Sequence, residues 1–425
     1  MCKSLSKWHF DVENDKLVDL VLDGKKTAYV DIYNGEKEEL NSESILIYDN
    51  EKSACITKTI KTIICKFRDI EWNLAKLEGI GNSLEEWKER RYNYFKSVSP
   101  NFNDNTLVLV KIFEVTKNLK EERLSLGKLI AENNIEILGN ILTISEINAG
   151  FNNTIFDVND KYIIKVCGNK DYENLFDVEN NFYNEYKTKS FIPKLYKYDK
   201  SKIIVPFVYE IFEKIDGKSI YYYWYKWNEI ERENFIKDLV ECLNSIHVHK
   251  SVNDDWKNKI KNEVINNFNK CSEFFSEKEK TMIKKSFDLY DYILNDNYYS
   301  LIHNDLHFDN IFLDKNNQIK IIDFNDSLVA PFDYDYRILF MCEEKPWKWA
   351  NIEMDPYQKP EDYKNIKLYI KRYCDKLGKI KYLDERIYIY EILDDMRNLS
   401  KYKLKEQVDN IVEKSKRILD MSKEV

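Results

Sequence analysis

Two carboxylates and one amide near predicted strand ends stand out among the five aspartates and several amides of the segment LIHNDLHFDNIFLDKNNQIKIIDFND, residues 301–326. They are Asp305, Asn310 and Asp323, and they flank short runs rich in isoleucine that predict β-strands. Side chains at the ends of neighbouring strands can converge on one site. Oxygen ligands of this kind hold magnesium beside phosphate oxygens, or divide into one base and two metal ligands. The segment therefore carries the groups that phosphoryl transfer requires.

The spacing of these groups also resembles a known family. The pattern His-x-Asp-x-x-x-x-Asn, followed by Ile-Asp-Phe, is similar to that of the aminoglycoside phosphotransferase and choline kinase family, relatives of the protein kinases. The resemblance implies that Asp305 is the catalytic base or orients the substrate hydroxyl, with its geometry held by the loop and His303. It implies that Asn310 and Asp323 hold magnesium. Asn304 stands where the family usually has glycine.

A nucleotide-binding lobe should precede this segment. Gly150, Asn153, Phe156 and Val158 form the pattern Gly-x-x-Asn-x-x-Phe-x-Val, which the family uses in place of a three-glycine loop. Lys165 ends the next predicted strand, where the resemblance places the lysine that pairs with the nucleotide phosphates. The implied cofactors are ATP, or alternatively GTP, and Mg²⁺.

The phosphate-binding lysine needs an acidic partner on the following helix. Both Glu179 and Glu185 qualify, and we choose Glu179 because two aromatic residues follow it and Pro193 closes the segment at the family's distance. The connection between the two lobes is expected at Glu213 to Ile215, whose backbone groups would meet a purine edge.

Further motif positions leave alternatives open. In the segment APFDYDYRILF, either Asp333 or Asp335 would brace the catalytic loop, and a solvated turn explains the acids equally well. His247 and His307 are expected to be hydrogen-bonded structural residues. The aromatic run IYYYWYKW at residues 220–227 suggests a wall for a ring-shaped substrate, although a helix facing the core is favoured.

The first part of the chain has different features. WHFDVENDKLVDLVLDGKKTAYV, LAKLEGIGNSLEEWKERRYNYF and the closing NDNTLVLVKIFEV together look like the ASCH domain, a small β-barrel related to RNA-binding PUA domains. Some members hydrolyse an N-acylated cytidine nucleoside with a lysine, a threonine and a glutamate. Lys26 and Glu78 occupy matching positions beside Thr27, but Tyr29 stands where the threonine often lies. We therefore favour binding of a nucleoside or RNA element over hydrolysis, with an interaction module lacking a ligand as the alternative.

Composition limits the remaining possibilities. The 425 residues exceed the size of a single core, and the net charge of −8 gives no basic excess for strong binding to nucleic acid or an anionic membrane. The eight cysteines form no CxxC pair, which argues against zinc. No apolar run resembles a signal peptide or a membrane span, so a reduced, cytoplasmic protein without a membrane partner is expected.

The expected elements follow from periodicity. Residues 16–23 and 83–95 predict helices, and the β-branched runs at 44–49, 53–65 and 105–116 predict strands. The predicted fold class is α+β: an ASCH-like PUA-type β-barrel at 1–118, then a bilobal kinase-like domain at 122–425. Its small lobe should span about 122–215 and its large lobe, mostly helical from Glu229, about 216–425.

The sequence thus predicts a phosphotransferase that uses a small-molecule hydroxyl, such as that of an aminoglycoside-like compound, amino alcohol, sugar or nucleoside. The alternative is a nucleic-acid or nucleoside sensor with a catalytically silent kinase fold. The intact groups at Lys165, Asp305, Asn310 and Asp323 argue against it. The sequence leaves the acceptor and the oligomeric state open.

Overall fold

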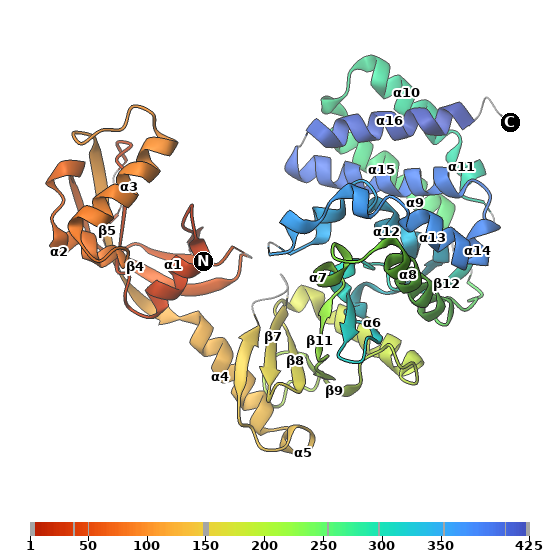
Figure 1. The fold of residues 1–425 in the computed structure, drawn as a ribbon, viewed down its shortest axis with the longest axis horizontal. Helices are drawn as coiled ribbons and strands as arrows, with labels where there is room; N and C mark the ends of the chain where they lie inside the picture. Colours follow the sequence, from red (N-terminus) through yellow and green to blue (C-terminus); the bar gives the residue numbers. More distant parts are fainter. Residues whose placement is uncertain are drawn as a thin grey trace. The chain divides into compact units, whose positions relative to one another are not determined.

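The computed structural model describes residues 5–36, 39–49, 51–147, 153–252, 255–295, 298–351, 353–403 and 405–421. They form two compact units: Met1–Lys170 with Asp199–Tyr209, and Asp171–Tyr198 with Glu210–Val425. The α+β class predicted from the sequence is confirmed, because both units combine helices with sheets (Figure 1). Each unit is described by itself.

The first unit begins with a five-stranded sheet. Its elements are β1 (Ser6–Trp8), α1 (Asn14–Leu22), β2 (Ala28–Ile32), β3 (Glu43–Ile47), β4 (Ser53–Lys66), α2 (Trp72–Ala75), α3 (Leu84–Val98) and β5 (Leu107–Asn118). The strand order is β1-β3-β4-β5-β2, with β1 parallel to β3 and the other pairs antiparallel. Register shifts between Ile56 and Thr57 and between Thr59 and Lys61 bend the long β4–β5 ribbon.

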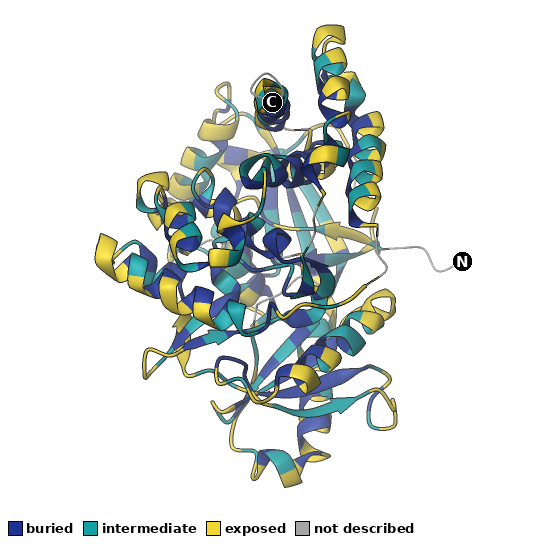
Figure 2. Cartoon of the chain, turned by 90° about the vertical axis from the view of Figure 1, so that its right-hand side faces the viewer, coloured by how far each residue is buried: buried dark blue, intermediate teal, exposed yellow. Residues whose placement is uncertain are grey.

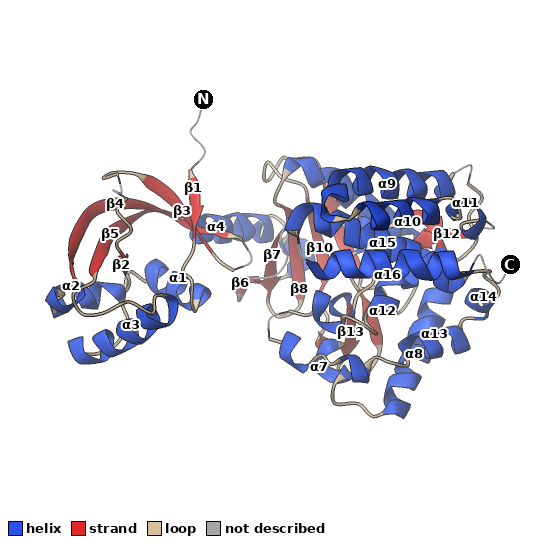
Figure 3. Cartoon of the chain, turned by 90° about the horizontal axis from the view of Figure 1, so that it is seen from above, coloured by secondary structure: helices blue, strands red, loops and turns tan. Residues whose placement is uncertain are grey.

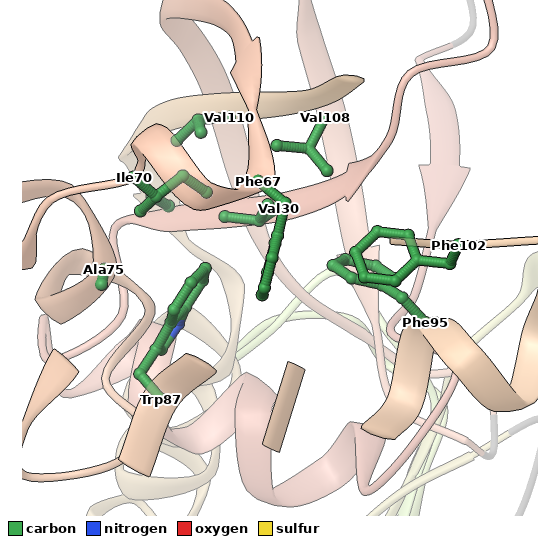
Figure 4. Close-up of a cluster of buried hydrophobic side chains, with 10 residues drawn as sticks. Val30, Phe67, Ile70, Ala75, Trp87, Phe95, Phe102, Val108 and Val110 are labelled. Atoms are coloured by element: carbon green, nitrogen blue, oxygen red, sulfur yellow. The ribbon is translucent and has the colours of Figure 1, made fainter. Parts of the chain in front are cut away.

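The bent ribbon carries two hydrophobic cores. One lies under α3, where Phe67 stacks on Trp87 at 5.7 Å between ring centroids (Figure 4). The other packs Val18 and Val21 of α1 against Leu46 and Phe113. Helix α1 ends before Gly24 at a φ of 69°, as the sequence predicts, because glycine adopts this left-handed conformation without strain.

The rest of the first unit continues from β5 without a loop. It contains α4 (Leu119–Glu132), α5 (Ile135–Leu138), β6 (Ile144–Ile147), β7 (Asn153–Val158) and β8 (Tyr162–Cys167). The Asn118 side chain caps α4 by accepting a hydrogen bond from Glu121 N at 3.0 Å. Strands β6, β7 and β8 pair in antiparallel order.

The second unit is mostly helical. Its helices are α6 (Glu173–Tyr186), α7 (Tyr221–Trp224), α8 (Glu229–Asn244), α9 (Trp256–Cys271), α10 (Glu277–Phe287), α11 (Tyr290–Ile293), α12 (Arg337–Met341), α13 (Ile366–Tyr373), α14 (Asp375–Gly378), α15 (Leu383–Tyr402) and α16 (Lys405–Met421). Its strands are β9 (Leu195–Asp199), β10 (Tyr209–Glu213), β11 (Gly217–Ser219), β12 (Tyr299–Ile302), β13 (Ile311–Asp314), β14 (Ile319–Ile321) and β15 (Leu328–Pro331), of which β9 and β10 each reach one residue into the first unit.

The large helical part is built around α15. This helix packs against α9 and α16, and α10 also packs on α16 (Figure 3). The middle of α15 is covered on all sides, since Ile389–Leu393 are all buried, and exposed residues line the outer helix faces (Figure 2). The predicted aromatic helix at residues 220–227 is only one turn, α7, but its Tyr221 and Trp224 are buried as expected.

Candidate active site

A β-hairpin brings Asn310 and Asp323 to the same place. Strands β13 and β14 are antiparallel with Ile311 opposite Ile321, and Ile322 N donates to Asn310 O at 3.0 Å. At the open end of the hairpin, Asn310 comes directly before β13, and Asp323 comes directly after Ile322 on the opposite side. The φ of 64° at Asp323 then turns the chain into a short 3-10 helix, Phe324–Asp326. The two predicted metal ligands are therefore neighbours across the hairpin.

Asp305 lies beside Asn310. The Nδ2 atom of Asn310 donates to Asp305 O at 2.9 Å and lies 3.4 Å from Asp305 Oδ2. With its amide nitrogen used in this way, Asn310 has its Oδ1 atom left to act as an acceptor. The local fold thus gathers a carboxylate and an amide oxygen at the open end of the hairpin that also carries Asp323.

The Asp305 side chain is 36% exposed, and its Oδ2 atom lies 3.4 Å from Nε2 of His307. Burial alone would raise the pKa of this carboxyl. The hydrogen bond and charge of His307, with the charges of His303 and Arg337, outweigh burial and hold the pKa below its ordinary value. Asp305 is therefore an ionised, accessible carboxylate at neutral pH, as a base requires.

His303 holds the loop rather than transferring a proton. Its ring is fully buried, with Nε2 2.8 Å from Ile322 O, and its Nδ1 accepts from Asp305 N at 3.2 Å. Both ring nitrogens are thus engaged with the backbone. Its ring also lies 4.7 Å from that of Phe324, between centroids. His303 is a positioning residue for Asp305 and for Ile322, the residue before Asp323.

Asn304, between His303 and Asp305, stands where the family usually has glycine, and its backbone conformation explains why asparagine fits there. Asn304 has a φ of 70°, a left-handed conformation that asparagine tolerates better than most residues. Its Nδ2 donates to Asp326 O at 3.1 Å, which ties the catalytic loop to the turn after Asp323.

Of the two acids that the sequence left open, Asp335 braces the catalytic loop. Its carboxylate is buried and accepts from His303 N at 3.2 Å and Asn304 N at 2.8 Å. The Nε2 atom of His247 lies 2.8 Å from Oδ2. Burial would raise the pKa of Asp335, but the hydrogen bond and charge of His247 help to lower it. His247 is thus the structural histidine that the sequence predicts.

Asp333 has a different role. It forms a buried ion pair with Arg386 of α15, at 2.8 Å between Oδ2 and Nε, and accepts from Tyr390 Oη at 3.0 Å. Sequence reasoning missed Arg337, whose Nη2 donates to Asn304 O at 2.8 Å and whose guanidinium lies 3.9 Å from the Tyr334 ring centroid. The only signal was an arginine following the acidic segment.

Burial favours Glu179 over Glu185. Glu179 is 1% exposed, and its Oε1 accepts from Phe324 N, the residue after Asp323, at 3.3 Å. The Phe324 ring stacks on Phe182 of α6 at 4.0 Å between centroids. Glu185 instead forms a surface ion pair with Lys250. Glu179, and not Glu185, therefore contacts the turn that follows Asp323.

The remaining residues that the sequence assigns to the nucleotide stay predictions. Lys165 is buried on β8 in the first unit, opposite Ile155, whereas Glu179 belongs to the second unit, so their pairing stays a prediction. Asn153 begins β7, and Gly150 lies outside the described residues.

At the expected lobe connection, Glu213 N already donates to Lys194 O at 2.8 Å. This amide is thus engaged within the protein. Ile215 follows the end of β10 and is partly exposed, so its backbone is the more suitable predicted contact for a purine.

The donor atoms fit magnesium that is shared with phosphate. Within the described residues, no three His, Cys, Asp or Glu side chains lie close enough to hold a metal alone. Mg²⁺ commonly takes one or two protein carboxylates and completes its shell with phosphate oxygens and water. Asp323 and the Oδ1 atom of Asn310 match this pattern. Bound there, the ion would neutralise charge on the phosphates.

In the N-terminal part, Lys26 and Glu78 form an ion pair at 3.3 Å, and both side chains have zero exposure. Glu78 also accepts from Val30 N, Trp87 Nε1 and Arg91 Nε at 3.1, 2.8 and 2.7 Å. Burial lowers the pKa of Lys26 to about 8. Thr27 adjoins this cluster through its backbone, with N donating to Leu77 O at 2.7 Å.

Comparison with known proteins identifies both parts. Residues 6–117 match the ASCH domain model, and residues 143–369 match the model described as the phosphotransferase enzyme family. The second match covers more than half of the chain, which therefore belongs to this family and is a kinase-type phosphotransferase. The predicted order, an ASCH domain followed by a phosphotransferase fold, is confirmed. No curated protein sequence matches significantly.

Two solved aminoglycoside phosphotransferase structures share the fold of the larger part of the chain. The GDP complex of wild-type aminoglycoside 2'-phosphotransferase-IIIa is 16% identical, covering 69% of this chain and 98% of its own, with a TM-score of 0.50. A GDP and kanamycin complex of APH(2")-IIia is also 16% identical, covering 70% and 98%, with a TM-score of 0.50. An ASCH domain from Lactobacillus crispatus is 22% identical over 27% of this chain and 81% of its own, with a TM-score of 0.26. No helix among the described residues could cross a membrane.

Proposed function

We propose that this phosphotransferase moves the γ-phosphate of ATP or GTP, with Mg²⁺, to a hydroxyl of a small molecule. The observation that supports it is the position of Asp305, an ionised and partly exposed carboxylate held against Asn310 at the hairpin that ends in Asp323. A hydroxyl placed against Asp305 would lose its proton to this carboxylate as the bond to phosphorus forms.

Each remaining residue has one part in the proposal. Asn310 and Asp323 hold magnesium, and Lys165 binds the phosphates with Glu179 as its acidic partner. The backbone at Glu213 to Ile215 meets the purine. His303 and Asp335 hold the loop, as their contacts with its backbone amides indicate.

The residues proposed to act as base and metal ligands do not determine which class of hydroxyl compound accepts the phosphate. The kanamycin complex among similar structures makes aminoglycosides one candidate, beside amino alcohols, sugars and nucleosides. A screen should therefore incubate the full chain with Mg²⁺ and ATP or GTP and measure nucleoside diphosphate release with each of these compounds.

The deciding variant is Asp305→Asn. We expect it to lower kcat by about 10²–10⁴-fold, the usual contribution of a general base, while the Kd for nucleotide changes less than about threefold. Asp288→Asn, an exposed change at the end of α10, is the matched control and should keep the parent rate. Turnover of an identified acceptor by Asp305→Asn at the parent rate would refute the proposal.

For the ASCH domain, we propose binding of a nucleoside or a short RNA element rather than hydrolysis. The zero exposure of Lys26 and Glu78 disfavours direct attack on a bound substrate. Trp8 and Tyr29, 6.1 Å apart between centroids, lie beside Lys111, which is 5.6 Å from the Trp8 ring, and could stack a base next to a cation. Trp8→Ala should weaken binding of a fluorescent RNA oligonucleotide in an anisotropy titration, and unchanged binding would exclude this surface.

A further inference from the structure

A cavity of about 160 Å³ lies within the first unit, and none of its lining residues has been given a role above. Its lining combines Asp15 and Asp19 of α1, Tyr48 after β3, Lys120 and Arg123 of α4, and Glu146 of β6. The lining therefore comes from the ASCH residues and from the elements that follow them. The volume is roughly ten times the 10–15 Å³ that one water needs, but below the 300–1,000 Å³ typical of drug-sized ligands.

Two charged groups in this lining have an unused atom. Arg123 donates from Nε to Glu146 Oε1 at 2.9 Å and from Nη1 to Ser53 O at 2.6 Å, while Lys52 Nζ lies 2.7 Å from the same Glu146 oxygen. Among the described residues, Nη2 of Arg123 and Oε2 of Glu146 are buried without a hydrogen-bond partner. The Glu146 side chain is only 6% exposed. A buried donor and a buried acceptor left unmatched are costly unless something fills the space between them.

The other lining groups extend this pattern at the rim. Lys120 Nζ lies 3.3 Å from Asp19 Oδ1, and the hydroxyl of Tyr48 donates to the same oxygen at 3.1 Å. The side chains of Lys120 and Asp19 are 45% and 59% exposed, so both can turn toward an incoming molecule. The rim thus offers one further cation and one further carboxylate.

The charges restrict what can bind. A simple anion would meet three carboxylates, Asp15, Asp19 and Glu146, against two cations in the lining. A simple cation would leave Nη2 of Arg123 unmatched. A metal ion is not indicated, because no suitable group of His, Cys, Asp or Glu is present in the described part of the chain. A molecule that carries both a cationic and an anionic group satisfies both unused atoms.

We propose that this cavity binds a small zwitterion of amino-acid size. Its anionic group lies on Arg123 and Lys120, and its ammonium group lies on Glu146 and Asp19. The ligand joins α1 and α4 to β6, whose Glu146 pairs with Phe156 on β7. Occupancy therefore ties the ASCH residues to the strands that carry Lys165, independently of the acceptor site.

Isothermal titration calorimetry on the full chain tests this assignment. The probes are glycine, β-alanine and γ-aminobutyrate, which separate the two charges by increasing distances, with acetate and methylamine as single-charge controls. We expect saturable binding of at least one zwitterion at one site per chain, and at least tenfold weaker binding of acetate and methylamine. Heats no larger than dilution for all zwitterions would show that only water fills the cavity. Equal binding of a single-charge control would show that the second charge is not recognised, and either result would overturn the proposal.

Two variants locate the site. Glu146→Gln removes the buried charge, and Lys120→Gln removes the charge of a side chain that is 45% exposed. Each should weaken the zwitterion at least tenfold, whereas Lys117→Gln, an exposed change outside the cavity, should leave its Kd unchanged. If Glu146→Gln does not fold, Lys120→Gln decides alone. Unchanged affinity in Lys120→Gln would place the ligand elsewhere and overturn the proposal.

Discussion

Asn304 holds the catalytic loop in a left-handed turn, with a φ of 70° and a side-chain bond to Asp326 O. Asn304→Ala should lower the free energy of unfolding by about 1–2 kcal/mol, because a Cβ without a local hydrogen bond is strained in this conformation. Asn304→Gly should stay closer to the parent, since glycine adopts the turn freely. Urea titrations of both variants measure the difference, and equal stability of the alanine and glycine variants would contradict this explanation.

Glu78 pairs with two cations, the fully buried Lys26 and the largely buried Arg91. Glu78→Gln should therefore destabilise the first unit by about 3–5 kcal/mol, because it leaves the ammonium of Lys26 buried without its counter-charge. The exposed change Glu89→Gln on α3 is the control and should be close to neutral. Thermal melting of the full chain measures both, and a melting temperature for Glu78→Gln equal to that of the control would refute the argument.

The same residue predicts a pH dependence. Burial would raise the pKa of Glu78, but Lys26 and Arg91 outweigh it, so the folded-state pKa lies below the ordinary value of 4.5. The ionised carboxylate thus contributes stability above about pH 4.5, and this is lost as pH falls through the folded-state pKa. Melting between pH 3 and pH 7 should show a smaller acid-side loss in Glu78→Gln than in the parent. Parallel curves would contradict it.

Residue types and spacing were enough to predict that Asp305, Asn310 and Asp323 lie near one another, because a short hairpin and the loop before it bring them together. The same information could not choose between Asp333 and Asp335. Their roles depend on distant partners, His247 on one side and Arg386 on the other, which no local spacing reveals.

At the level of elements, β-branched runs predicted the long strands of the N-terminal sheet, because a pleated, half-buried surface favours such residues. Helix α3 begins after Ser83 as expected, since the serine side chain accepts from Glu86 N at 3.2 Å. What the pattern could not show is how helices pack on strands. That depends on close approaches such as the one at Gly127.

Helix α4 approaches β7 closely through Gly127, where a Cβ would meet the fully buried Phe156 ring at 2.8 Å. Alanine in a helix normally gains about 0.5–1 kcal/mol over glycine, but this clash should cost more. We expect Gly127→Ala to destabilise by about 1–3 kcal/mol in urea titrations. Gly378→Ala, whose Cβ would meet nothing within 4 Å, should be neutral or slightly stabilising. Stabilisation by Gly127→Ala would show that Phe156 can move.

At the scale of the whole molecule, the compact units do not coincide with the two family matches. The ASCH match ends at residue 117, yet the first unit continues to Lys170. The physical reason is the junction: β5 ends at Asn118 and α4 begins at Leu119, and Arg123 of α4 then bonds back to Ser53 O. A sequence boundary marks a change of pattern, whereas a folding unit is defined by packing.

This junction predicts cooperative unfolding across the family boundary. In differential scanning calorimetry of the full chain, the ASCH residues and residues 119–170 should melt in one transition, because α4 is capped by Asn118 and anchored by Arg123. Inserting Gly-Ser-Gly-Ser between Asn118 and Leu119 removes the cap from its helix and lengthens the connection, and should split this transition or lower its midpoint. The same insertion after Gly35, in the exposed loop between β2 and β3, should not. Separate ASCH melting in the parent chain would show that the first unit is not cooperative and that the junction does not couple its parts.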